Sequence, residues 1–78
     1  WRTRKGAEVD FVIEWEGRRA AVEVKHTDRP GPKDFAGLAA FHELEGDCGR
    51  FLVCRVERAQ KFDAGLALPF SRLGEVFA

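Results

Sequence analysis

Residues 6–25, GAEVDFVIEWEGRRAAVEVK, decide the fold that we predict for this chain. Apolar and polar residues alternate on both sides of Glu16 and Gly17, which is typical of two β-strands joined by a tight turn. If Glu16 and Gly17 are the two loop residues, the register places Asp10 directly opposite Glu23. A four-residue loop gives the same pairing. An odd-length loop would put the two carboxylates on opposite faces, so the prediction depends on an even loop or a compensating bulge.

Side chains alternate across a strand, so this hairpin has one apolar face and one charged face. We expect the apolar face to be the core. On the charged face, two directly opposed carboxylates repel each other and destabilise the sheet unless a cation lies between them. That cation is either the ammonium group of Lys25 or a divalent metal such as Mg²⁺, which usually takes one or two carboxylates. The apolar face carries Val9, Phe11, Ile13, Trp15, Ala20, Val22 and Val24, and the charged face carries Glu8, Asp10, Val12, Glu14, Arg19, Ala21, Glu23 and Lys25.

The composition is that of one small globular domain, since 45% of the 78 residues are hydrophobic and 33% are charged. A core of this size is marginal, which favours self-association or a neighbouring domain. The chain has no methionine and stops within an apolar element, so we expect a fragment of a longer protein. No apolar run approaches the length of a membrane span and no signal-peptide pattern precedes Trp1, so we expect a cytoplasmic protein that does not enter a membrane.

The charge balance gives no electrostatic footprint for a nucleic acid, because 13 basic and 13 acidic residues cancel. A basic groove elsewhere on the domain, or on a missing domain, is still compatible with nucleic-acid binding. Cys48 and Cys54 lack the close spacing of a zinc knuckle or a redox pair, and we expect a loop residue and a buried strand residue. A zinc site that joins them to His26 and His42 is disfavoured by the same spacing.

The rest of the chain predicts a crossover unit that follows the hairpin. A loop at residues 26–31 leads to a helix over residues 32–45, with Pro32 at its start and Gly46 after its end. The helix carries an apolar stripe of Phe35, Leu38, Phe41 or His42, and Leu44. The apolar run at residues 51–56 is typical of a buried strand, which we expect to lie parallel to the strand of Glu23.

Three further segments complete the predicted elements. Residues 1–5 form a short edge strand, whose arginines are either solvated or in contact with a phosphate backbone. Residues 57–65 are a loop, and residues 66–68 a short strand. Pro69 then opens a final helix through Phe70, Leu73, Val76 and Phe77.

Asp10 on one strand and Glu23-Val24-Lys25 on the next resemble the motif of the PD-(D/E)XK nuclease superfamily. The wider wording, WRT at residues 1–3, GAEVDFV at 6–12 and VEVK at 22–25, looks more narrowly like the C-terminal domain of unassigned function in bacterial and archaeal AAA+ ATPases. The resemblance covers most of the chain. It implies a restriction-endonuclease-like α/β fold: a small mixed sheet with an antiparallel hairpin, a crossover helix and a parallel strand.

The resemblance also implies roles for individual residues. Asp10 and Glu23 would be ligands of Mg²⁺ or Mn²⁺, with the carbonyl of Val24 as a further ligand. Lys25 would position or help to deprotonate the attacking water, or stabilise charge on the phosphoryl oxygens. The expected reaction is hydrolysis of a nucleic-acid phosphodiester, with DNA expected ahead of RNA and an ATPase domain of the same chain as a partner. Glu8 is either a second partner of Lys25 or a surface charge.

Several features depart from the superfamily pattern or allow another interpretation. Val9 replaces the familiar proline before Asp10, and the acidic residue that many members carry on a preceding helix does not fall within this chain. No glycine-rich Gly-Lys-Ser or Gly-Lys-Thr loop occurs, so we expect no ATP binding by the chain itself. In purely structural terms, Asp10, Glu23 and Lys25 are an exposed sheet face with cross-strand ion pairs, and His26 is a loop residue. The alternative function is a catalytically inactive nuclease fold that serves as a binding or regulatory module of the ATPase.

Overall fold

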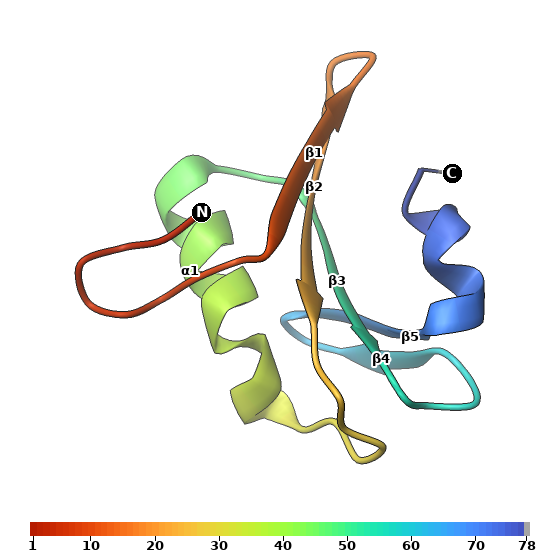
Figure 1. Ribbon diagram of the computed structural model, residues 1–78. Coiled ribbons are helices and arrows are strands. Elements are labelled where there is room, and N and C mark those ends of the chain that lie inside the picture. The colour runs from red at the N-terminus through yellow and green to blue at the C-terminus, as the bar shows by residue number, and fades with distance from the viewer. Residues whose placement is uncertain (78) are drawn as a thin grey trace.

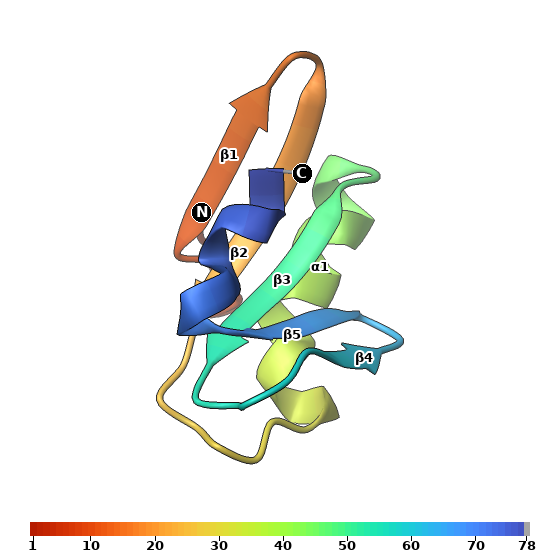
Figure 2. The ribbon, with the colours of Figure 1, turned by 90° about the vertical axis from the view of Figure 1, so that its right-hand side faces the viewer.

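A computed structural model describes residues 1–77 of the chain, which form one five-stranded mixed sheet with a helical layer on each face. The strand order is β1-β2-β3-β5-β4. Figure 1 shows α1 and the N-terminal segment on one side of the sheet and the C-terminal segment η2 on the other, and Figure 2 views the sheet from the η2 side. The elements are β1 (Phe11–Trp15), β2 (Arg18–Val24), the 3₁₀ turn η1 (Pro32–Phe35), α1 (Ala36–Glu45), β3 (Gly49–Cys54), β4 (Gln60–Phe62), β5 (Gly65–Pro69) and the 3₁₀ segment η2 (Phe70–Phe77).

The hairpin has the two-residue turn that the sequence predicts. Glu16 and Gly17 both adopt positive φ angles, 48° and 76°, as a two-residue hairpin turn of the mirror-image type requires. The antiparallel register runs from Phe11 opposite Val22 to Trp15 opposite Arg18. Asp10 immediately precedes the first of these pairs, which brings it level with Glu23 and confirms the predicted even-length loop.

The crossover unit is also confirmed. The predicted helix begins as the 3₁₀ turn η1 at Pro32, continues as α1 and ends before Gly46, whose φ is 96°. β3 then pairs in parallel with β2, and Glu23 lies beside Leu52. The strand begins at Gly49, two residues before the predicted start, because residues 49 and 50 continue the ladder with Ala20 and Ala21.

The prediction of a single core face is wrong, because both faces of β2 are buried. α1 lies on the face that was expected to be charged and exposed, where Ala21 is fully buried together with Phe35, Leu38 and Phe41. The opposite face forms a second cluster around Val22 and is covered by η2. A strand with one layer on each side is buried on both faces, whatever its polar and apolar alternation.

Three residues of the expected apolar sets lie elsewhere. Val9 joins the α1 cluster rather than the Val22 cluster, because the chain bends at Asp10 before β1 begins. Phe11 is 57% exposed, since it lies at the start of an edge strand. Leu44, the last member of the predicted helix stripe, is 62% exposed.

The predicted edge strand at residues 1–5 is wrong. This segment folds back on residues 7–9 around an isolated bridge between Arg2 and Glu8, and it turns across α1 instead of extending the sheet (Figure 1). The ring of Trp1 packs edge-on against Phe41, with 5.1 Å between ring centroids. At Gly37 a Cβ atom would lie 2.0 Å from the backbone oxygen of Glu8, so only glycine allows the segment to approach the helix this closely.

The C-terminal part differs from the prediction in two elements. Residues 57–65, predicted as a loop, contain the short edge strand β4, which pairs antiparallel with β5. Three residues with the sequence Gln-Lys-Phe carry too little alternation to reveal a strand. The predicted final helix is the 3₁₀ segment η2, which buries Val76 against the sheet. In residues 1–77, no helix has the length and apolar character needed to cross a membrane.

Candidate metal centre

The carboxyl groups of Asp10 and Glu23 meet at the point where β1 begins and β2 ends. The Asp10 carboxylate accepts a hydrogen bond from the Val24 backbone N–H, with 2.9 Å between Oδ2 and N. The protonated Glu23 carboxyl donates a hydrogen bond to Asp10. Glu23 is 9% exposed whereas Asp10 is exposed, so one carboxyl group is enclosed by protein and the other faces solvent. The predicted pairing of the two acids is therefore confirmed.

This contact separates the acidities of the two groups. Burial, followed by the hydrogen bond and the negative charge of Asp10, raises the pKa of Glu23 from 4.5 to about 7. The hydrogen bonds from Glu23 and from the Val24 N–H lower the pKa of Asp10. Below about pH 7 the pair consequently holds one shared proton, as two adjacent carboxyl groups do when no cation balances them.

Lys25 is held at the edge of this site by Asp34. The Lys25 Nζ lies 3.8 Å from Asp34 Oδ1, and the side chain of Asp34 is 13% exposed. The other carboxylate oxygen of Asp34 accepts a hydrogen bond from the Gly31 N–H at 2.9 Å, which fixes its orientation. Nothing in the local sequence around Asp34 shows that the crossover returns this residue to Lys25.

An open cleft of about 430 Å³ lies beside Glu23. Glu23 and Lys25 line it from β2, Asp34 from η1, and Glu8 from the N-terminal segment. Lys5 and Lys33, which are both exposed, add two further ammonium groups. The cleft thus combines several carboxylates with three lysine ammonium groups.

Glu8 and His26 are the remaining sequence candidates. Glu8 lines the cleft but forms its ion pair with Arg2, at 3.4 Å, rather than with Lys25. His26 is exposed and stacks on the ring of Phe70, with 6.2 Å between centroids. His26 is therefore a loop residue, as predicted.

The donor set restricts the kind of metal that the site fits. Within residues 1–77, no group of three or more His, Cys, Asp or Glu side chains is arranged to hold a metal ion. Two touching carboxylates beside an open cleft fit Mg²⁺ or Mn²⁺, since Mg²⁺ keeps several water ligands and takes only one or two carboxylates. They do not fit a structural zinc site, which needs four protein ligands. Cys48 and Cys54 are free thiols whose pKa values are raised by burial.

The fold and the site define a small mixed α/β domain with a paired-carboxylate cleft. The family model described as "Domain of unknown function (DUF4143)" matches residues 1–73, so the chain belongs to this family. The match includes Asp10, Glu23, Val24 and Lys25. No curated protein and no solved structure matches the chain.

Proposed function

We propose that this chain is a PD-(D/E)XK-like, metal-dependent nuclease domain that hydrolyses nucleic-acid phosphodiesters. One observation carries the proposal: the carboxyl groups of Asp10 and Glu23 touch each other, and Glu23 lines an open cleft together with Lys25. A purely structural sheet face would avoid this pairing, because two opposed carboxylates destabilise a ladder.

Asp10 and Glu23 would hold Mg²⁺ or Mn²⁺, with the Val24 carbonyl as a further ligand by the resemblance. The bound ion would supply a more acidic water and neutralise charge on the phosphate. Glu23 must release its proton to become a ligand, and a pKa of about 7 makes that release accessible near neutral pH. The Asp10 carboxylate is already ionised, because its hydrogen bonds lower its pKa.

Lys25 would present its ammonium group to the water or to the phosphoryl oxygens. Asp34 restrains it at 3.8 Å, so Lys25 can turn toward a bound phosphate without losing a strong ion pair. The expected substrate is DNA ahead of RNA. The family is typically associated with AAA+ ATPases, which supports a place for this domain at the C-terminal end of such a chain.

A second candidate function is a binding or regulatory module of the ATPase that has kept the nuclease fold without its activity. Two observations favour it. Asp10 and Glu23 satisfy each other through the shared proton, and Lys25 has a partner in Asp34. A site that is satisfied in this way is stable without an ion.

Calorimetric titration of Mg²⁺ and Mn²⁺ at pH 8 separates the two functions. We compare the parent chain with Asp10→Asn and Glu23→Gln, and use Glu8→Gln as a matched control that removes a cleft carboxylate outside the proposed ligand set. Binding in the parent and the control, but in neither ligand variant, supports the metal centre. Cleavage of single- and double-stranded DNA by the parent and the control, but not by the ligand variants, then supports the nuclease. Binding that is absent, or equally weakened by Glu8→Gln, rejects the assignment of Asp10 and Glu23 as ligands.

A further inference from the structure

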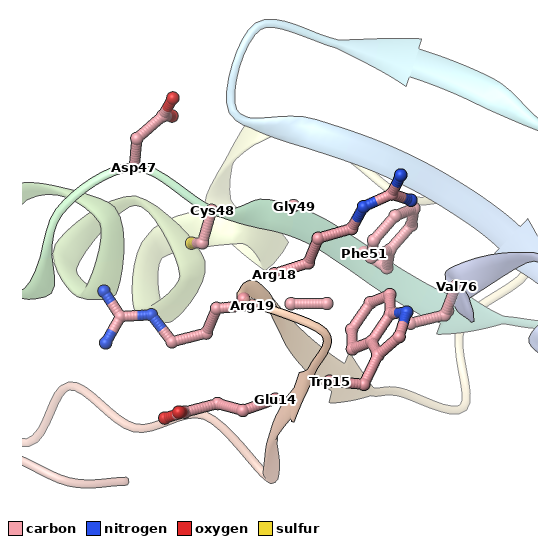
Figure 3. A pocket seen from close by; sticks show the side chains of 11 residues that line it. Glu14, Trp15, Arg18, Arg19, Asp47, Cys48, Gly49, Phe51 and Val76 are labelled. Carbon is pink, nitrogen blue, oxygen red and sulfur yellow. The ribbon is translucent and has the colours of Figure 1, made fainter. Parts of the chain in front are cut away.

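A second cleft, of about 640 Å³, lies at the opposite end of β2 from the paired carboxylates. Figure 3 shows the side chains that line it. It forms where the turn end of the β1–β2 hairpin meets the start of β3. Its volume falls within the roughly 300–1,000 Å³ of sites that bind small molecules. None of the residues of the candidate metal centre lines it.

The strand register divides the lining of this cleft into two chemically different sides. Trp15 pairs directly with Arg18, and alternation along β2 puts both on the η2 side of the sheet. Phe51 pairs with Val22 and lies on the same side. Trp15 and Phe51 pack beside the cluster that contains Val76. Figure 3 shows Trp15, Phe51 and Val76 together, with Arg18 above them.

The other side of the cleft carries Glu14 and Arg19, and Arg19 has partners within the protein. Glu14 lies opposite Arg19 in the hairpin ladder. The Arg19 guanidinium donates a hydrogen bond to the Glu45 carbonyl and lies 5.4 Å from the centroid of the Phe41 ring. Arg18, in contrast, is exposed and forms no ion pair with any of residues 1–77. The guanidinium that is free to meet a ligand is therefore on the aromatic side.

Nucleotides are bound without regard to the identity of the base by groups of this kind: a partly exposed indole and phenyl ring, an apolar floor and one available guanidinium. The base stacks on the aromatic ring, and the phosphate meets the arginine. We propose that the Trp15–Arg18–Phe51 side of this cleft binds a nucleobase with its adjacent phosphate, either in a free nucleotide or in a single strand.

This site is separate from the metal centre. Arg18 and Glu23 are five residues apart on β2, which corresponds to roughly 16 Å along the strand, and their side chains lie on opposite faces. The inference therefore does not depend on ion binding by Asp10 and Glu23.

The two tryptophans make the test direct. Trp1→Phe leaves Trp15 as the single fluorophore, and Trp15→Phe leaves Trp1, which packs on Phe41 away from the cleft. We titrate each variant with thymidine monophosphate and with a short oligothymidylate, in EDTA. We expect saturable quenching of Trp15 and none of Trp1. Saturation by the mononucleotide identifies a free-nucleotide site, and saturation by the oligonucleotide alone identifies a strand site.

Arg18→Gln in the single-Trp15 chain should weaken binding about tenfold, the effect of losing one charge-assisted hydrogen bond. Arg58→Gln is the matched control, because Arg58 is an exposed arginine that does not line the cleft. Adding Asp10→Asn and Glu23→Gln should leave the titration unchanged, which separates this inference from the nuclease proposal. The inference is overturned if neither probe quenches Trp15, if Arg18→Gln and Arg58→Gln have equal effects, or if the metal-ligand variants abolish binding.

Discussion

Replacing Glu23 with glutamine should remove a pH dependence from the stability of this protein. The pKa of Glu23 is raised from 4.5 to about 7 in the folded state, so the folded chain keeps a proton that the unfolded chain loses between these pH values. The free energy of unfolding of the parent should therefore fall as the pH rises from about 4.5 to about 7. At about 1.4 kcal/mol for each pKa unit, the complete fall is about 3–4 kcal/mol. Asp10 leaves this window unchanged, because its pKa is lowered and it titrates at more acidic pH.

Glu23→Gln imitates the protonated carboxyl group, since its amide can still donate a hydrogen bond to Asp10 and carries no charge. We expect the variant and the parent to have similar stability at pH 5. At pH 8 the variant should be more stable by about 3–4 kcal/mol. Urea unfolding followed by tryptophan fluorescence in EDTA, at pH 5, 6, 7 and 8, measures this difference.

Glu43→Gln is the matched control, because Glu43 is an exposed carboxylate on α1, and its pH profile should follow the parent. Magnesium at ten times its dissociation constant should raise the stability of the parent at pH 8 by about 1.4 kcal/mol and leave Glu23→Gln unchanged. If the parent and Glu23→Gln show the same pH profile, Glu23 is not a buried, protonated group and the description of the site is wrong.

Three substitutions test the packing that positions the site. Gly37→Ala should destabilise the chain by about 1–3 kcal/mol, because the new Cβ would lie 2.0 Å from a backbone oxygen of the N-terminal segment. The control is Gly74→Ala, whose Cβ meets nothing within 4 Å and which should be near neutral. Thermal melts compare the two variants. Phe41→Ala should lower the free energy of unfolding by about 3–5 kcal/mol. Leu44 is 62% exposed, so Leu44→Ala should change this free energy by less than about 0.5 kcal/mol in the same urea series. Asp34→Ala removes the acceptor of the hydrogen bond at the start of η1 and should reduce stability by about 1 kcal/mol; an unchanged unfolding midpoint would show that this hydrogen bond contributes nothing.

Local chemistry was sufficient to predict the hairpin and the crossover. Glu16 and Gly17 adopt the positive φ angles of a two-residue turn, and an even loop then fixes which residues face one another. Pro32 marks the start of the helical stretch, because its ring fixes φ at a helical value. Gly46 marks the end, because glycine readily adopts the positive φ that terminates a helix. Short or polar elements gave no such signal, and β4 was missed for that reason.

The environment of the site depends on contacts between residues far apart in the sequence. Alternation along β2 predicted one buried face, but α1 covers the other face as well, and this burial brings Glu23 to 9% exposure and its pKa to about 7. The approach of Asp34 to Lys25 depends on the path of the crossover. The position of Glu8 depends on the close packing of its backbone against Gly37.

The sequence by itself therefore determined the pairing of Asp10 with Glu23, the strand that carries Lys25 and the parallel strand that follows. These features rest on turn geometry and on the period of side-chain alternation, both of which act over a few residues. Only the tertiary structure decided that Glu23 is buried, that Lys25 has a partner in Asp34, and that Trp15, Arg18 and Phe51 share a cleft. Burial and proximity of this kind arise from the packing of distant segments, which no local pattern encodes.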